Sequence, residues 1–445
     1  MPKVDPVRDA AVQVLLRVFE HGAFLDLASD ALLSKKQLSE RGKRFFTQLV
    51  CGTVRHRLLV DHILQRLVTQ PLEHLPRPIL AILRMAAFQA LFCNQVTPPA
   101  LTHTSVELAK KYGHSGTARL VNAVVRRLPK SLDNVPLPNP RNEPIEFLRT
   151  RYSVPTWILE MWIAQLGIEE TKQLCQALEE PAPATLRVNT SRIEPKDFLQ
   201  NLIDEGFPAS KETPIPEEVT LLKGSLSIRS KWFREGFCMM QDPAAMLGCH
   251  LLEPKSKDLI LDICAAPGGK TTHLAEKTGK QARIIAADVH FGRTKLIIQN
   301  VLRLNAEGVH VVCANGLTPP FQEKSFDRVL VDAPCSGLGT LRRHPDIKWR
   351  LQHEDLENCS TMQERLLRSA ISLCKNDGVL VYGVCTFTPA ETEKVIDRII
   401  ATESVIPEDG PEWLNKWRKK TGIYQTLPHR DNMDGFFWTR LRKQS

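Results

Sequence analysis

The chain has 445 residues, 42% hydrophobic and 24% charged, with 11 cysteines and a formal net charge of +9. This length predicts two or three domains, and the composition is that of a soluble globular protein. No run approaches the roughly 20 apolar residues of a membrane span, no secretory signal opens the chain, and the cysteines lack the spacing of zinc sites or disulfide frameworks. We therefore expect a cytoplasmic protein with free thiols, no metal and no membrane contact.

The basic residues are concentrated at the N-terminal end. Residues 1–130 hold 19 Lys and Arg against 9 Asp and Glu, whereas the rest of the chain holds 40 against 41. Apolar residues recur there at helical spacing, and prolines near residues 76 and 98 mark helix boundaries. We predict an all-α domain over residues 1–133 that binds the phosphates of a nucleic acid. The alternative is a basic surface that only favours solubility.

A proline-rich linker follows this domain and leads to two further regions. Residues 145–225 combine helical patterns with the strand-like run Thr185–Val188, which predicts a small α+β connector. In residues 226–445, strand-like and helical runs alternate, which predicts βαβ units and a Rossmann-like α/β domain with a parallel sheet. The expected strands are Leu259–Ile263, Arg283–Val289, His310–Cys313, Phe326–Val331 and Gly378–Val384.

A glycine-bearing turn follows the first of these strands. Gly268 and Gly269 have no Cβ atom, so a ligand can approach the backbone closely, and the helix expected next directs free N–H groups there. Asp288 ends the next strand and is placed to accept hydrogen bonds from a ribose diol. The turn is not a P-loop, because Cys264 stands where that motif requires glycine. We therefore predict a site for an adenosyl cofactor.

Two cysteines follow later strands. Cys335 closes the motif Asp332-Ala333-Pro334-Cys335, and Cys385 directly follows Val384. The carboxyl ends of parallel strands meet at one edge of a sheet, so both thiols and the Asp332 carboxylate should face the cofactor. A thiolate can add to C6 of a pyrimidine and thereby make C5 nucleophilic. The alternatives are buried apolar cysteines and a turn-forming aspartate.

These motifs resemble a known family. Residues 261–272, Asp332–Gly337 and Cys385-Thr386 resemble the cofactor motif and the two cysteine motifs of Nol/Nop/Sun-type RNA cytosine-C5 methyltransferases. Residues 45–64 and 82–128 resemble the NusB-like RNA-binding domain. The combination is similar, over nearly the whole chain, to the bacterial 16S ribosomal RNA methyltransferase B (RsmB/Sun) family.

The resemblance implies S-adenosyl-L-methionine as cofactor and 16S ribosomal RNA as substrate, naked or in a partly assembled subunit. We expect a monomer, although the sequence leaves the oligomeric state open. The resemblance also implies that Cys385 adds to cytosine C6, that Cys335 helps to release the covalent intermediate, and that Asp332 contacts the target base. A flipped or single-stranded cytosine would be required. The cofactor-binding residues implied are Cys264, Ala265, Ala266, Pro267, Gly268, Gly269, Lys270, Asp288, Asn315 and Asp332.

Three positions depart from the family pattern: Val154, which stands in the connector where a histidine is frequent, and two residues near the expected site. Asn315 stands where an aspartate usually lies near the adenine, and Val384 replaces the threonine that usually precedes the nucleophile. Two other functions also stay open. The same chemistry could act on transfer RNA, or the chain could be a non-catalytic RNA-binding or antitermination factor that has kept a relic cofactor pocket.

Overall fold

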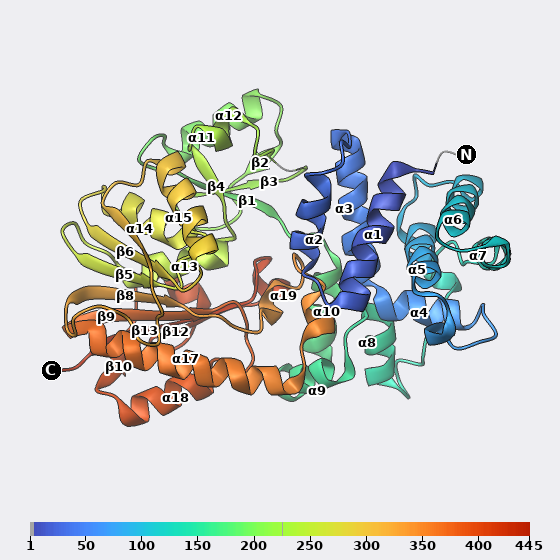
Figure 1. Cartoon of the computed structure of the whole chain (residues 1–445). Helices are drawn as coiled ribbons and strands as arrows, with labels where there is room; N and C mark the ends of the chain where they lie inside the picture. Colours follow the sequence, from blue (N-terminus) through green and yellow to red (C-terminus); the bar gives the residue numbers. More distant parts are fainter. Residues whose placement is uncertain (1–3, 225) are drawn as a thin grey trace. The chain divides into compact units, whose positions relative to one another are not determined.

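The computed structural model describes residues 4–224 and 226–445 and divides into two compact units (Figure 1). Unit 1 comprises the chain up to Glu180 together with Leu341–Leu351. Unit 2 comprises Pro181–Thr340 and Gln352–Ser445. Within the described ranges, no helix combines the length and the apolar character that crossing a bilayer requires.

Unit 1 is all-helical; it contains the predicted all-α region and continues to Glu180, through residues that the sequence pattern assigns to the α+β connector. Its α-helices are α1 (Pro6–His21), α2 (Leu25–Leu33), α3 (Glu40–Arg55), α4 (Arg57–Gln65), α5 (Arg77–Phe92), α6 (Pro98–Tyr112), α7 (Ser115–Arg126), α8 (Pro144–Tyr152), α9 (Thr156–Leu166), α10 (Ile168–Glu179) and α16 (Ile347–Arg350). Two 3-10 turns, Leu72–His74 and Leu132–Asn134, connect them. Asp5 caps α1 by accepting hydrogen bonds from the N–H groups of Val7 and Arg8. Helix α5 is buried on nearly all sides, and α3 crosses it at Gly52, where a Cβ atom would overlap the Phe88 ring.

The segment Leu341–Leu351 belongs to unit 1 although its neighbours in sequence belong to unit 2. Trp349 packs against the helical core, and its indole N–H donates to the Val54 carbonyl at 2.8 Å. The buried Lys348 donates to the Arg55 carbonyl at 3.0 Å, and burial lowers the pKa of its ammonium group to about 7. This segment therefore completes the packing of unit 1.

Unit 2 begins with the connector. Its elements are β1 (Ala184–Val188), α11 (Pro195–Asp204), β2 (Ala209–Ser210), β3 (Glu218–Leu221), α12 (Lys231–Arg234) and β4 (Cys238–Met240). The strands pair in the order β2-β3-β1-β4, and all three pairings are antiparallel. Leu186 and Val188 of β1 pack with Phe198 and Leu202 of α11 in a separate small core. The fourth strand thus closes the connector sheet well beyond residue 225.

The rest of unit 2 is one mixed sheet with helices on both faces. Its strands are β5 (Leu259–Ile263), β6 (Arg283–Asp288), β7 (Val309–Cys313), β8 (Phe326–Asp332), β9 (Cys374–Val384), β10 (Val405–Pro407), β11 (Arg418–Lys420), β12 (Ile423–Thr426) and β13 (Phe436–Lys443). Its helices are α13 (Pro243–Leu252), α14 (Gly269–Lys277), α15 (Phe291–Leu304), α17 (His353–Leu373), α18 (Glu393–Thr402) and α19 (Pro428–Asp431). Two 3-10 turns, Leu338–Thr340 and Glu412–Trp417, lie in the loops.

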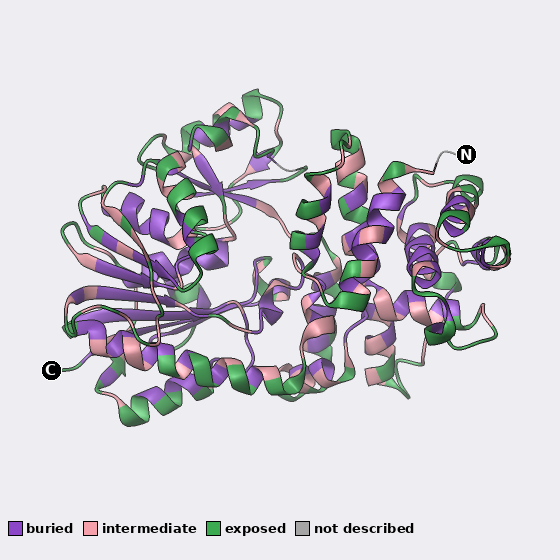
Figure 2. Ribbon diagram, in the orientation of Figure 1, coloured by how far each residue is buried: buried purple, intermediate pink, exposed green. Residues whose placement is uncertain are grey.

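The strand order β11-β12-β13-β9-β8-β5-β6-β7 explains where a ligand can bind. Strands β5 to β9 are parallel, and β13 runs antiparallel to β9. Helices α13 and α14 contribute to the core on one face, and α17 and α18 to the core on the other (Figure 1). The strands of the sheet are mostly buried, whereas α17 and α18 carry exposed residues (Figure 2). After β7 the chain returns to the other side of β5, so a crevice opens at the carboxyl ends of β5 and β8.

Candidate cofactor and thiol site

At the glycine turn between β5 and α14, the backbone passes close to the backbone of α15. Gly268 has φ +98° and precedes the first residue of α14. A Cβ atom on Gly268 would lie 3.2 Å from Cα of Ile297 on α15, so both the conformation and the space require glycine. The first N–H groups of α14 lie at this turn and, as at any helix start, have no acceptor within the preceding turn of the helix.

A cavity of about 140 Å³ lies at this turn. Most of its wall comes from the residues that the sequence predicts, but the connector supplies a second wall through β4 and the residue after it. The lining residues are Met239, Met240, Gln241, Ala245, Asp262, Cys264, Ala265, Ala266, Pro267, Gly269, Lys270 and Asp332. The predicted residues Gly268, Asp288 and Asn315 do not line it. Ligand pockets usually measure about 300–1,000 Å³, so this cavity fits one end of a cofactor.

Lys270 and Asp332 form an ion pair at the cavity, with 2.7 Å between Nζ and Oδ2. Burial acts to lower the pKa of Lys270, but the charge and hydrogen bond of Asp332 outweigh it and hold the pKa above its usual value. The ammonium group also lies 5.5 Å from the ring centres of Phe436 and Trp438. Lys270 is therefore a fixed cation that orients the Asp332 carboxylate.

Asp262, the fourth residue of β5, has a buried carboxyl group with one oxygen that can still accept a hydrogen bond. Its Oδ2 accepts a hydrogen bond from the Thr271 hydroxyl at 2.6 Å. Its Oδ1 is buried and has no hydrogen-bond partner among the described residues. Burial raises the pKa of Asp262 to about 7, and the nearby charge of Asp332 acts in the same direction. A cationic group in the cavity would satisfy this oxygen.

Asp288 and Asn315 differ in their surroundings. Asp288 is buried at the end of β6, where its carboxylate accepts hydrogen bonds from the N–H groups of Ala266 (3.3 Å) and His290 (3.0 Å). The bond from Ala266 joins the loop after β5 to the end of β6, and the bond from His290 shapes the turn after β6. Asn315 is exposed, and its side-chain carbonyl accepts from the Leu317 N–H at 3.0 Å, which stabilises its own loop.

The structure brings the two predicted cysteines together. Sγ of Cys335, in the loop after β8, lies 3.2 Å from Sγ of Cys385, which directly follows β9. The buried Glu391 carboxylate accepts from the N–H of Ser336 at 2.8 Å, and the Ser336 hydroxyl donates to the Thr386 hydroxyl at 3.1 Å. The loops that carry the thiols are thus joined by a buried polar network.

The surroundings of Cys335 favour its protonated form. The hydrogen bond with Cys385 and burial both raise the pKa of Cys335 well above its usual range. Cys335 therefore keeps its proton and can donate it to Cys385. Val384, which departs from the family pattern, is fully buried in the core between the sheet and α17.

Comparison with known proteins gives a consistent assignment along the chain. Three family models match in order: the NusB family over residues 5–130, the RsmF/B-like ferredoxin-like domain over 154–228, and 16S rRNA methyltransferase RsmB/F over 249–442. The chain is 31% identical to the probable ribosomal RNA small subunit methyltransferase B of Bacillus subtilis (strain 168), over 99% of this chain and all of the relative. The chain belongs to the ribosomal RNA small subunit methyltransferase B family.

Other members of this family and a solved structure agree. A probable ribosomal RNA small subunit methyltransferase B from a Synechocystis species is 31% identical, over 98% of this chain and 99% of the relative. The crystal structure of PH0851 superposes with a TM-score of 0.81 at 26% identity, over 99% of this chain and all of that one. These findings confirm the predicted membership of an S-adenosylmethionine-dependent RNA methyltransferase family and the predicted fold class.

Three side chains outside the cavity form a cluster whose residue types can bind a metal ion. The buried Glu217, His250 and His273 lie together in the described part of the chain, and Oε1 of Glu217 is 2.8 Å and 2.5 Å from Nε2 of the two histidines. Lys277 donates to Nδ1 of His250 at 3.0 Å, so Nε2 of His250 carries the proton and donates to Glu217. A metal ligand would need that nitrogen unprotonated. The cluster therefore acts as a hydrogen-bonded connection between the connector and α13–α14.

Sequence reasoning missed the residues that enter the site from outside the methyltransferase motifs. Met239, Met240 and Gln241 carry no pattern that places them at a cofactor, because their position depends on β4 pairing with β1. Glu391 follows Cys385 by only six residues, but its contact with Ser336 spans 55 residues. Asp262 had a detectable signal, since it is an acidic residue within a buried apolar strand.

Proposed function

We propose that this chain transfers a methyl group from S-adenosyl-L-methionine to C5 of a specific cytosine in 16S ribosomal RNA. The main support is the 3.2 Å approach of the Cys335 and Cys385 thiols, in loops at the carboxyl ends of β8 and β9, together with the Lys270–Asp332 pair at the end of β8. A buried inert cysteine needs no such neighbour, whereas addition to and release from a pyrimidine ring require a nucleophile and a proton acceptor.

The residues at the crevice fit the cofactor. Its methionine end carries an ammonium and a sulfonium group, which suit a cavity containing Asp332 and the unpartnered oxygen of Asp262. Asp288 at the end of β6 would hold the ribose, and the turn from Cys264 to Lys270 would contact the rest. The loop after β7 that carries Asn315 would lie near the adenine. When bound, the cofactor supplies an electrophilic methyl group.

The chain's own residues supply the covalent chemistry. The Cys385 thiolate forms a bond to C6 of the cytosine, and the electron pair displaced from the C5–C6 double bond makes C5 nucleophilic. Asp332, oriented by Lys270, would hydrogen-bond the ring and favour this adduct. The base must leave its stack to reach the thiol.

Release of the product depends on Cys335. Once Cys385 is a thioether it is a weaker hydrogen-bond acceptor and carries no negative charge, so both the hydrogen bond and the charge interaction through which Cys385 raises the Cys335 pKa are weakened. Cys335 then releases its own proton to water more readily, and its thiolate can accept the C5 proton, directly or through water. The C5–H electron pair re-forms the C5–C6 double bond as the C6–S bond to Cys385 breaks and its electron pair returns to the sulfur as the thiolate.

The direct test is bisulfite sequencing of unmodified 16S RNA and of total transfer RNA after incubation with the protein and cofactor. One newly protected cytosine in 16S RNA is the expected result. Protection only in transfer RNA would keep the chemistry and replace the substrate. No protection in naked RNA or in small-subunit particles would contradict the proposed activity.

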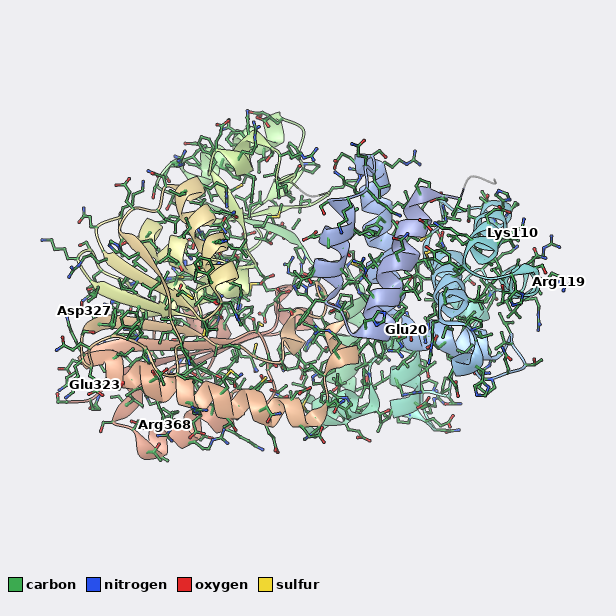
Figure 3. The ribbon with its side chains drawn as sticks, viewed as in Figure 1. Glu20, Lys110, Arg119, Glu323, Asp327 and Arg368 are labelled. Atoms are coloured by element: carbon green, nitrogen blue, oxygen red, sulfur yellow. The ribbon has the colours of Figure 1, made fainter. Side chains whose placement is uncertain are left out.

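The surface of unit 1 supports RNA as the polymer that it binds. A hollow of about 530 Å³ is lined by Arg41 and Arg44 of α3, both exposed. Further exposed cations lie on α6 and α7, among them Lys110 and Arg119 (Figure 3). Arginine forks suit phosphate groups.

Neutralising Arg41 and Arg44 with glutamine should weaken RNA binding and reduce its salt dependence. Each lost phosphate contact lowers the slope of log K against log salt by about 0.7 for single strands and about 0.9 for duplexes. Fluorescence anisotropy with a labelled 16S fragment at several salt concentrations measures this slope. Arg365→Gln, an exposed change on α17, serves as the control. An unchanged slope in the α3 variant would show that these arginines do not contact phosphates.

Cofactor affinity should rise with pH through the range around 7. The free protein holds Asp262 protonated below its pKa of about 7, whereas a cationic ligand favours the ionised form. Binding at lower pH therefore requires release of a proton, and affinity should fall about tenfold from pH 8 to pH 6. Calorimetry with S-adenosylhomocysteine measures this change, and Asp262→Asn should remove the pH dependence. Equal affinity of the unchanged protein at both pH values would contradict the role of Asp262.

A further inference from the structure

Arg187 of the connector is a fully buried cation that the proposed mechanism does not use. It lies on β1 between Leu186 and Val188, whose side chains belong to the connector core. Because side chains alternate along a strand, Arg187 leaves the opposite face of the sheet. Its side chain is 0% exposed. Burying an arginine is costly unless each of its N–H groups finds a partner.

The partners of Arg187 are concentrated on the helix that begins at the glycine turn. The guanidinium group donates to Oε1 and Oε2 of Glu276 at 2.8 Å and 3.2 Å, and to the Thr272 hydroxyl at 2.9 Å. It also donates to the Gly269 carbonyl and to the side-chain carbonyl of Gln241. One side chain thus binds the first, fourth and eighth residues of α14.

Two of these five contacts lie in the wall of the cofactor cavity. Gly269 is the first residue of α14, and Gln241 follows β4; both line the 140 Å³ cavity. Gly269 also faces the connector across the turn, since a Cβ atom there would lie 3.4 Å from Cε of Met239. The cavity is thus built from two modules, and Arg187 is hydrogen-bonded to both sides.

We propose that Arg187 is a positioning residue for the cofactor: it fixes the first turn of α14 and Gln241 in the arrangement that binds the methionine end. Arg187 does not line the cavity, so it acts through Gly269 and Gln241. The connector is then part of the cofactor site as well as a module beside it. This inference rests on the proposed use of S-adenosyl-L-methionine.

The end of the same strand offers a matched control. Asn189, which directly follows β1 and is two residues after Arg187, is also buried, and its amide donates to the carbonyls of Gly236 at 2.9 Å and Leu304 at 3.0 Å. It therefore attaches β1 to the end of α15, at a residue that does not line the cavity. Asn189→Ala should loosen the connector without disturbing the first turn of α14.

The test must separate positioning from stability, because Arg187→Met alone would leave the Glu276 carboxylate buried without its partner. The double variant Arg187→Met/Glu276→Met replaces the buried pair with apolar side chains, an exchange that is often neutral for stability. It also removes the hydrogen bonds to Gly269 and Gln241. Arg187→Lys keeps a cation but cannot make all five hydrogen bonds.

The experiment is calorimetry of the full chain with S-adenosylhomocysteine, with thermal unfolding and RNA binding measured in parallel. We expect the double variant to bind S-adenosylhomocysteine at least tenfold more weakly, with unchanged RNA affinity and a melting temperature within a few degrees of the original. Arg187→Lys should give an intermediate loss. Asn189→Ala should lower the melting temperature but leave the cofactor affinity unchanged.

Two outcomes would overturn the inference. One is unchanged affinity of the double variant for S-adenosylhomocysteine. The other is an equal loss of affinity in Asn189→Ala, which would show that general loosening of the connector is responsible. If the original protein itself fails to bind S-adenosylhomocysteine, the proposed function fails first, and the inference that rests on it falls as well. In steady-state kinetics, the positioning role predicts a higher cofactor KM with little change in kcat.

Discussion

Serine in place of Cys385 should abolish methylation of 16S RNA, with turnover reduced by at least about four orders of magnitude, as for loss of other covalent nucleophiles. A serine hydroxyl keeps its proton near neutral pH and is not activated by Cys335, because the raised pKa of Cys335 keeps its thiol protonated before an adduct forms. No C6 bond then forms, and C5 stays unreactive. Transfer of tritium from labelled cofactor to RNA measures the loss.

Cofactor binding gives the internal control for this variant. S-adenosylhomocysteine should bind Cys385→Ser as it binds the original protein, because Cys385 does not line the cavity at the glycine turn. Cys51→Ser, a change of a partly exposed thiol on α3, should keep full activity. Turnover within tenfold of the original in Cys385→Ser would exclude this thiol as the nucleophile.

Alanine in place of Cys335 is expected to trap the protein on its substrate. The nucleophile Cys385 stays in place, so the C6 bond forms and the methyl group is transferred. The variant lacks the Cys335 thiol, which lies 3.2 Å from Sγ of Cys385 and could accept the C5 proton. Elimination of Cys385 from C6 is therefore slower. A protein–RNA adduct that survives denaturing electrophoresis should appear only when both cofactor and RNA are present.

The double variant Cys335→Ala/Cys385→Ser distinguishes this adduct from other cross-links. It should form none, because the sulfur that bonds to C6 is absent. If Cys335→Ala turns over normally without an adduct, another base releases the product. If the adduct persists in the double variant, its covalent bond lies elsewhere in the chain.

Much of the fold could be predicted because the relevant signals are local. The run Leu259–Ile263 followed by Gly268 and Gly269 predicts a strand, a turn and a helix from adjacent residues. The edge that parallel strands share then places Cys335 and Cys385 together although 50 residues separate them. The family and the fold class are confirmed, whereas the roles of the individual site residues stay predictions.

The features that sequence reasoning missed depend on contacts between distant residues. Arg187 reads as one cation in an apolar strand, and its partner Glu276 lies 89 residues away. Nothing in residues 341–351 distinguishes them from the methyltransferase segments on either side, yet they pack in unit 1. Such placements follow from shape and hydrogen-bond complementarity in the folded chain, which a periodicity along the sequence does not encode.

The docking of Leu341–Leu351 in unit 1 also affects how the protein can be made. Trp349 and Lys348 complete the helical unit, but the ribosome synthesises them only after four strands of the second sheet. At about 5–20 residues per second, they emerge roughly 10–30 s after Glu180. Unit 1 is therefore incompletely packed until residues 341–351, which are flanked in the sequence by segments of unit 2, have been synthesised. Unit 1 therefore cannot complete its folding during synthesis before much of unit 2 has also been made.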